Sequence, residues 1–236
     1  MHLFYCPNLT GKNGQLNAGE SAHCIRVLRM RKGDSILVTN GKGSLHEVII
    51  TRDDPESCWF DVVSEISGKR VPAYSIHIAI APTKSIHRFE WFMEKSVELG
   101  INQITPLICQ RSERRQLKTD RFQKLIISTM KQAVITVMPE LNEPLYVTDF
   151  VESVKNLQVM KFIGHCNDGN RQMLQNVYKK GADSIFLIGP VGDFTPEEVN
   201  FAIKEGFIPV TLSSNRLRTE TAGLAACHAI HVLNGT

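Results

Sequence analysis

The sequence predicts an α/β fold for the last 160 residues, preceded by a small domain of β-strands. From residue 75 onward, compact apolar segments alternate with amphipathic segments of helical period, which is typical of a mainly parallel sheet covered by helices. The first 70 residues carry short apolar runs between tight turns, which favours a small β-barrel. Hydrophobic residues make up 42% and charged residues 22% of the 236 residues, as expected for a globular protein.

The N-terminal β domain is predicted from one hairpin and one alternating run. Apolar segments at residues 36–39 and 45–51 flank the hairpin-type turn at 40–43, and residues 59–66 alternate as a third strand. A short helix at 21–29 would present His23, Arg26 and Arg29. Residues 67–72 read as a linker, so we expect domains at 1–70 and 73–236.

The C-terminal domain is predicted from apolar strands that alternate with helices whose ends are marked by capping residues or glycine. We expect strands at 75–81, 101–108, 160–164, 185–188 and 207–212, and helices ending at Gly100 and spanning 120–138 and 170–179. A further helix has clear boundaries: Thr195 is a good N-cap, Pro196 suits the first turn, Glu198 completes a capping box, and Gly206 ends it.

Several classes of protein are disfavoured by composition. No apolar run approaches the roughly 20 residues that span a bilayer, and the N-terminus does not resemble a signal peptide. The six cysteines lie far apart and contain no Cys-x-x-Cys pair, so we expect reduced thiols, no metal site and a cytoplasmic location. One reactive thiol remains an open alternative.

Basic residues are concentrated in two segments although the net charge is only +3. Residues 111–131 hold seven basic against two acidic side chains, and a second cluster lies at 26–32. Such patches suit a polyanion such as RNA. The alternative is a pair of solvated faces. The candidate RNA contacts are His23, Arg26, Arg29, Arg31, Arg111, Arg114 and Arg115.

Two loops near the C-terminus predict a ligand site. Residues 189–192 form a glycine loop after a buried strand, and residues 216–222 form a polar loop after the next strand. Loops at the carboxyl ends of parallel strands commonly build a ligand crevice. Arg218 and Glu220 stand between apolar neighbours, so we expect both to be partly buried. The alternatives are a tight turn for the first loop and an ordinary helix start for the second.

Several motifs, in order, resemble a known family. They are His23 to Arg29 followed by Gly33-Asp34, the helix Glu90 to Gly100 with its Glu-Leu-Gly end, Thr105-Pro-Leu107, Arg111-Ser-Glu113, Ile188 to Glu198, and Leu217 to Ala222. On these motifs the chain resembles the RsmE-like 16S ribosomal RNA uridine-N3 methyltransferases of the SPOUT superfamily, over nearly its whole length.

The sequence departs from the family pattern at several positions. The family usually has Glu at Val191, often Gly at Asp193 and Gly at Ser213, where a side chain would narrow the cofactor pocket if the backbone required positive φ. A Glu-Gln-x-Gly-Arg segment of many members is replaced by residues 131–135. These changes bear on substrate contacts more than on the fold.

The resemblance implies a PUA-like RNA-binding barrel and a SPOUT-type domain with a trefoil knot. It further implies a homodimer that binds 16S ribosomal RNA or the assembled small subunit, with S-adenosyl-L-methionine as cofactor. Arg218 would offset the charge of an anionic uracil, and Glu220 would orient Arg218 or act as the base. The implied cofactor contacts are Ile163, Gly164, His165, Gly189, Pro190, Gly192, Leu212, Ser213, Leu217, Thr221 and Ala222.

Two rival hypotheses stay open at this stage. One is a SPOUT methyltransferase that acts on another RNA, such as transfer RNA. The other is an inactive RNA-binding assembly factor, which the departure at Val191 keeps in consideration. The modified nucleotide, the need for an assembled subunit and the identity of the base do not follow from the sequence.

Overall fold

The computed structural model describes residues 2–66, 72–166 and 171–235. Within these ranges the chain divides into two compact units, each described by itself. The first comprises Met1–Val71 with Ile127–Met138, and the second comprises Pro72–Ile126 with Pro139–Thr236. Most of the predicted linker at 67–72 lies outside the described residues.

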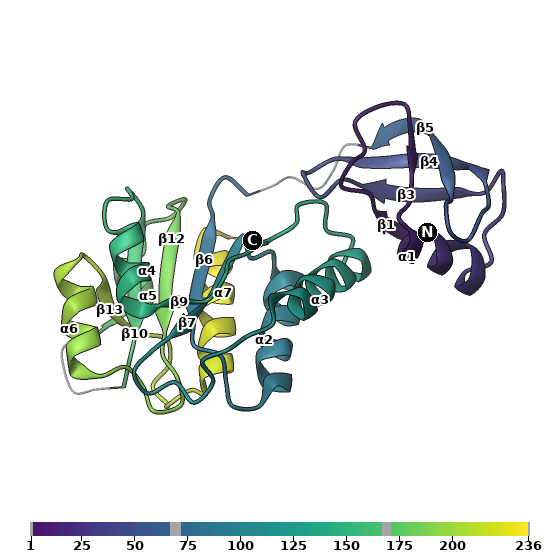
Figure 1. The fold of residues 1–236 in the computed structure, drawn as a ribbon. Helices are drawn as coiled ribbons and strands as arrows, with labels where there is room; N and C mark the ends of the chain where they lie inside the picture. Colours follow the sequence, from purple (N-terminus) through teal and green to yellow (C-terminus); the bar gives the residue numbers. More distant parts are fainter. Residues whose placement is uncertain (1, 67–71, 167–170, 236) are drawn as a thin grey trace. The chain divides into compact units, whose positions relative to one another are not determined.

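The first unit is built on a five-stranded sheet with the order β1-β3-β4-β5-β2 (Figure 1). Its apolar residues alternate toward a core that includes Phe4, Val38 and Phe60, and β3, β4 and β5 run antiparallel as the hairpin pattern predicts. Closure of the sheet into a barrel stays a prediction. The strands are β1 Leu3–Tyr5, β2 Asn13–Gln15, β3 Ser35–Thr39, β4 Leu45–Arg52 and β5 Trp59–Ile66.

The predicted helix at 21–29 is present in a shifted form. The chain forms α1 at Ala18–Ala22 and continues as one π-helical turn, η1, at His23–Val27. Asn17 caps α1, because its side chain accepts a hydrogen bond from the Glu20 N–H at 2.9 Å. Arg29, just beyond, has φ of 57°.

A segment distant in sequence completes the first unit. Helix α3 covers Thr119–Gln132, shorter than the predicted 120–138, and Val134 takes φ of 53° directly after it. That left-handed residue ends the helix, so the following residues become extended. The Met138 N–H then donates to the Gly41 carbonyl at 2.8 Å, and Lys131 pairs with Glu20 at 2.8 Å.

The second unit holds a parallel sheet with the order β11-β13-β10-β12-β6-β7-β8, and β9 also pairs with β7. Strands β6 and β12 are buried at every position, as expected for a sheet covered on both faces. The described strands are β6 Ile76–Ile80, β7 Gln103–Ile108, β8 Glu140–Leu141, β9 Leu145–Tyr146, β10 Met160–Gly164, β11 Gln172–Met173, β12 Ser184–Ile188 and β13 Ile208–Thr211.

Helices cover both faces of this sheet (Figure 1). One face packs against α4 (Val147–Val154) and α6 (Pro196–Lys204) through a core that includes Phe150, Leu187 and Ala202. On the other face α2 (Ile86–Leu99) packs against α7 (Thr219–Asn234). A Cβ at Gly223 would lie 2.6 Å from the Phe92 ring, so α7 approaches α2 closely only because this residue is glycine.

Residues 172–179 differ from the predicted helix at 170–179. They form the short strand β11 and the four-residue helix α5 (Leu174–Val177), and Asn170 lies outside the described residues. The Gln172 and Met173 backbones pair with β13, which takes up hydrogen-bonding groups that a helix would use internally. In the described part of the chain, no helix is long and apolar enough to cross a bilayer.

Candidate functional site

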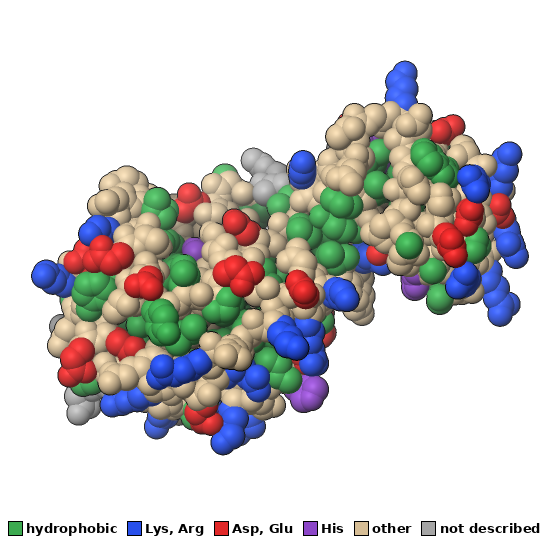
Figure 2. Space-filling model, viewed as in Figure 1, with side chains coloured by type: hydrophobic (Ala, Val, Ile, Leu, Met, Phe, Trp, Pro, Cys, Tyr) green, Lys and Arg blue, Asp and Glu red, His purple; other side chains and the backbone are tan. Residues whose placement is uncertain are grey.

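The polar loops predicted to form a site lie at one edge of the second unit's sheet. Strands β6, β7, β10, β12 and β13 are parallel, so the loops that follow them leave at the same edge. Figure 2 shows Lys and Arg side chains gathered along the lower edge of this unit, where these strands end in Figure 1. Exposed basic residues of these loops include Lys84, Arg111, Arg115, Arg216 and Arg218.

The glycine loop connects β12 to α6. Gly189 and Pro190 are buried, whereas the Val191 side chain is 58% exposed. The predicted capping box is confirmed: the Thr195 N–H donates to Glu198 Oε2 at 2.8 Å, and the Thr195 hydroxyl accepts from the Glu198 N–H at 3.3 Å.

Two neighbouring elements hold this loop. The buried Thr219 hydroxyl donates to the Gly189 carbonyl at 3.0 Å, and Arg111 Nη1 donates to the Gly192 carbonyl at 2.8 Å. The second carboxylate oxygen of Glu198 accepts from the Gln110 N–H at 2.8 Å. The main chain between β12 and α6 is therefore ordered by contacts from the loop after β7 and from the start of α7.

Arg218 and Glu220 differ in their surroundings more than expected. Arg218 is the exposed N-cap of α7, and its side chain makes no capping hydrogen bond. Glu220 is only 7% exposed, and its Oε1 lies 3.8 Å from Nε of Arg88 on α2. The expectation that both are partly buried is wrong for Arg218, because the N-cap precedes the packed face of the helix.

The other predicted cofactor contacts lie around the same edge. Ile163 and His165 are buried, and Gly164 is partly buried at the end of β10. Leu212, Ser213 and Leu217 are partly buried after β13, whereas Thr221 is exposed and Ala222 is partly buried on α7.

The backbone differs from the expectation raised for Ser213. Among the described non-glycine residues, those with positive φ are Arg29, Val134 and Asp193, so Ser213 does not take that conformation. Asp193, the other departure, has φ of 63°. Of these two positions it is therefore Asp193, and not Ser213, that adopts the backbone glycine favours.

The arginines predicted to bind RNA in this unit all make hydrogen bonds within it. Arg114 Nη2 donates to the Lys84 carbonyl at 2.9 Å, and Arg115 Nη2 donates to the Gln110 carbonyl at 3.1 Å. Together with the Arg111 bond, these contacts give the three guanidinium groups a role in shaping the loop edge. Contact with RNA stays a prediction for them.

The predicted RNA contacts of the first unit include three exposed arginines. Arg26, Arg29 and Arg31 are exposed, and His23 is partly buried with its ring 6.1 Å from Phe4. The Arg31 guanidinium lies 3.9 Å from the Asp53 carboxylate, and the Arg31 backbone N–H donates to Asp34 Oδ2 at 2.7 Å. Three cations therefore project from η1 and the turn that follows it.

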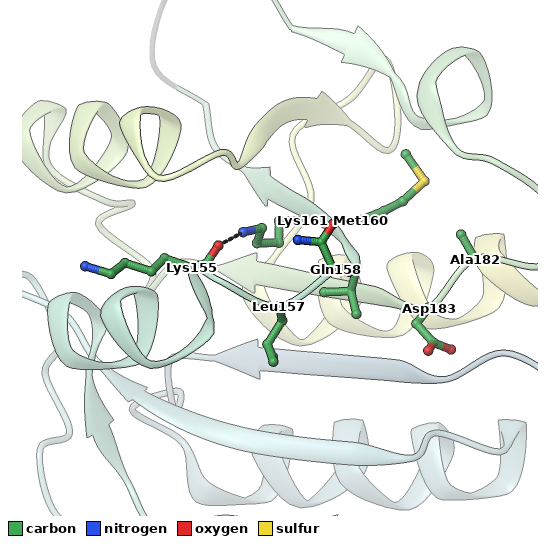
Figure 3. A pocket seen from close by; sticks show the side chains of 8 residues that line it. Lys155, Leu157, Gln158, Met160, Lys161, Ala182 and Asp183 are labelled. Atoms are coloured by element: carbon green, nitrogen blue, oxygen red, sulfur yellow. Dashed lines mark hydrogen bonds between the residues drawn. The ribbon is translucent and has the colours of Figure 1, made fainter.

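Hollows on the described surface of the second unit include the following two. One, of about 430 Å³, lies at the amino ends of β10 and β12 (Figure 3). There the Lys161 ammonium donates a hydrogen bond to the carbonyl of Lys155, the C-cap residue of α4. The Lys161 ammonium is therefore already bound to the end of this helix. The other, of about 530 Å³, is lined by residues around the start of α3, Leu117 to Arg121 and Lys124.

Burial keeps two of the cysteines protonated. Burial raises the pKa of the Cys109 thiol and raises that of Cys227 to about 12, so both stay protonated at neutral pH. Cys166 is exposed, next to His165. Within residues 2–66, 72–166 and 171–235, no three His, Cys, Asp or Glu side chains are grouped as metal ligands would be.

The sequence does not indicate the contacts that two residues of this edge make. Thr219 reads as a helix cap, but its hydroxyl reaches back to the glycine loop. Arg88 lies 132 positions before Glu220 and outside the Glu90 to Gly100 motif of its helix, so only the packing of α2 against α7 brings the two together.

Comparison with known proteins agrees with this architecture. Residues 70–231 match the family model of an RNA methyltransferase domain, and residues 16–63 match that of an RNA methyltransferase PUA domain. The chain is 27% identical to the ribosomal RNA small subunit methyltransferase E of Mesomycoplasma hyopneumoniae (strain 232), over 85% of this chain and 86% of the relative.

Solved structures also resemble the whole chain, among them the following two. A probable rRNA-methyltransferase from Porphyromonas gingivalis is 37% identical, with a TM-score of 0.91, covering 100% of this chain and 99% of that chain. A ribosomal RNA small subunit methyltransferase E from Neisseria gonorrhoeae, bound to S-adenosyl methionine, is 26% identical, with a TM-score of 0.88, covering 99% and 98%.

The fold and the loop edge thus define an α/β RNA methyltransferase domain joined to a PUA domain. Within that class, the chain belongs to the ribosomal RNA small subunit methyltransferase E family.

Proposed function

We propose that this protein transfers a methyl group from S-adenosylmethionine to N3 of a uridine in 16S ribosomal RNA of the small subunit. The observation that carries the proposal is the edge of ordered, basic loops at the carboxyl ends of the parallel strands, within a chain that matches the RNA methyltransferase family along residues 70–231. A relative of the same overall fold binds S-adenosyl methionine.

The loop edge suits an adenosine-containing cofactor. Partly buried Leu212 and Leu217 offer apolar contact to the adenine base, and the glycine loop offers backbone polar groups for its edges. A Cβ at Gly189 would lie 3.0 Å from the Phe194 ring, so a side chain in this turn would require that ring to shift. We infer that loops after β10, β12 and β13 hold the cofactor in a trefoil knot.

Binding of RNA would involve both parts of the chain. We infer that residues 1–70 form a PUA-like barrel whose exposed Arg26, Arg29 and Arg31 contact phosphates. Residues 73–236 would form the methyltransferase domain, which the family resemblance places in a homodimer. A protein that modifies ribosomal RNA would act in the cytoplasm.

The chemistry requires an anionic base next to an electrophilic methyl group. Uridine N3 is a weak nucleophile until it loses its proton, and the bound cofactor supplies the activated methyl. Arg218 is exposed at the amino end of α7, where a nearby anion is favoured both by its charge and by the helix dipole. We infer that Arg218 stabilises the uracil anion. We infer further that buried Glu220, with Arg88 as its counter-ion, orients Arg218 or acts as the base.

One observation supports a different function. Val191 presents a 58% exposed apolar side chain in the glycine loop, where the family resemblance leads one to expect a carboxylate. If that loss abolished catalysis, the protein would be an RNA-binding assembly factor. Such a protein would bind RNA but transfer no methyl group.

The test compares RNA substrates under one set of conditions. Full-length protein is incubated with methyl-labelled cofactor and with naked 16S RNA, assembled small subunits or transfer RNA. Label in 16S RNA, alone or within subunits, supports the proposal. Label mainly in transfer RNA would identify a methyltransferase of another substrate class, and RNA binding without label would identify the assembly factor.

A further inference from the structure

The side chain of Asp193 joins two of the loops at the site edge. Its Oδ2 accepts a hydrogen bond from the Cys166 N–H at 2.7 Å, and its Oδ1 accepts from the Phe194 N–H at 2.8 Å. Strands β10 and β12 pair in parallel and end at Gly164 and Ile188. The bond to Cys166 therefore crosses directly between the loops that leave these two strands.

The backbone of Asp193 is adapted to this contact at some cost. Its φ of 63° lies in the left-handed region, which glycine adopts freely and other residues adopt reluctantly, although aspartate tolerates it better than most. Its N–H donates to the Pro190 carbonyl at 2.9 Å, which closes a tight turn. Glycine would serve that turn without strain, so the turn alone does not account for a carboxylate.

The bond to Cys166 does account for it. Cys166 lies 27 residues away in sequence, so this hydrogen bond is not part of the local turn. An ionised carboxylate that accepts from backbone N–H groups makes a stronger hydrogen bond than a neutral acceptor. Arg111 and Thr219 tie the glycine loop toward β7 and α7, and Asp193 ties it toward β10.

We propose that Asp193 is a positioning residue, which sets the spacing between the loop at 165–166 and the glycine loop and so raises the affinity for the cofactor. The proposal rests on the proposed function, in that it assumes that S-adenosylmethionine binds at this edge. Loops that are already ordered lose less conformational freedom when a ligand binds, and the gain appears as affinity. Asp193 itself need not touch the cofactor.

The test uses full-length protein and three variants. Asp193→Gly removes the carboxylate and also removes the strain at positive φ, so lost bonds are not confused with backbone strain. Asp193→Asn keeps one acceptor oxygen. Asp183→Asn is the matched control, because Asp183 Oδ1 also accepts from a backbone N–H, that of Ser75 at 2.6 Å, but at the opposite edge of the sheet.

Three quantities are measured for each protein: affinity for S-adenosylmethionine by calorimetry, methyl transfer at saturating cofactor, and exchange of the Cys166 amide hydrogen without ligand. For Asp193→Gly we expect about tenfold weaker affinity, as for loss of one charge-assisted hydrogen bond, with saturated turnover within about twofold of wild type and faster Cys166 exchange. The affinity of Asp193→Asn should lie between those of Asp193→Gly and the wild type. Asp183→Asn should match the wild type in all three quantities.

The outcomes separate this proposal from the proposed function. Wild-type affinity for S-adenosylmethionine in Asp193→Gly overturns the proposal, even if the Cys166 amide hydrogen exchanges faster. The hydrogen bond between Asp193 and Cys166 would then stabilise the fold alone. Equal weakening by Asp183→Asn overturns it as well. If Asp193→Gly does not fold, the comparison of the two Asn variants decides. A wild-type protein that binds no S-adenosylmethionine overturns the proposed function and this proposal together.

Discussion

Glu220 at the start of α7 faces Arg88 of α2, with 3.8 Å between Oε1 and Nε. The carboxylate is buried and the arginine side chain is half exposed. A buried carboxylate requires a counter-charge or hydrogen-bond donors, and Arg88 supplies the cation from a neighbouring helix. The exposed Arg218 two residues earlier is therefore not required for that task and is available to a substrate anion.

Removal of the Arg88 charge should destabilise the fold. Arg88→Met keeps the aliphatic stem but leaves Glu220 without this cation, so we expect the free energy of unfolding to fall by about 1–2 kcal/mol, less than for a fully buried pair. Arg52→Met, which breaks an exposed pair with Asp54, is the control and should leave the free energy of unfolding nearly unchanged. Chemical denaturation measures both.

A second substitution checks the cause of that loss. The double variant Arg88→Met with Glu220→Gln should recover most of the lost stability, because no uncompensated charge then remains buried. Additive losses in the double variant would show that the two side chains contribute independently.

Replacement of Arg218 should affect activity and leave stability unchanged. Arg218→Ala removes an exposed cation from the amino end of a helix, so melting should stay at the wild-type temperature. Methyl transfer should fall by roughly 3–4 kcal/mol of transition-state stabilisation if Arg218 offsets charge on the uracil. Arg216→Ala, an exposed neighbour, is the matched control. Normal turnover in Arg218→Ala would remove this residue from the site.

The basic residues of the first unit should set the salt dependence of RNA binding. Each lost phosphate contact lowers the slope of log affinity against log salt by about 0.7–0.9. The double variant Arg26→Gln with Arg31→Gln should therefore lower the slope by roughly 1.5, whereas Arg52→Gln should leave it unchanged. An equal slope in all three proteins would show that these arginines are only solvated. Cofactor affinity should be the same throughout.

Stability should fall in acid in part because of buried His77. Burial lowers the pKa of His77 from 6.5 to about 4, and its Nε2 lies 2.7 Å from the Thr105 hydroxyl. The unfolded chain binds the proton more readily, so stability is lost as pH falls from about 6.5 toward 4, by about 3 kcal/mol at most. The loss attributable to His77 is measured as the difference from His77→Gln in denaturation at several pH values.

The control for this pH effect is His2→Gln, which removes an exposed histidine. It should follow the wild-type curve. A His77→Gln protein with an unchanged pH dependence would show that other groups cause the acid loss.

The regular parts of the fold follow from local sequence signals. Strand β5 begins and ends at the predicted residues, Trp59 and Ile66, and the capping box at Thr195 is confirmed. Such features depend on alternation, turn chemistry and capping within a few residues. The predicted end of α3 is wrong by six residues, because Val134 takes a left-handed backbone conformation that the sequence around it does not signal.

The site is less predictable because its contacts join distant segments. Sequence motifs indicate the glycine loop and the segment at 216–222. They do not indicate the partners that hold these loops, such as Gln110 for Glu198 or Cys166 for Asp193. Each of these partners contributes a backbone N–H, which every residue except proline has, so no side-chain pattern marks it.

The position of the transferred methyl group tests the central claim most directly. After reaction with 16S RNA or small subunits, the modified nucleoside is identified by mass spectrometry and located by primer extension. N3 lies on the Watson–Crick edge, so a methyl group there should stop reverse transcription. We predict 3-methyluridine at one position, with the stop absent from RNA treated with Arg218→Ala. A methyl group on another atom or another base, or no modification of ribosomal RNA, would contradict the account.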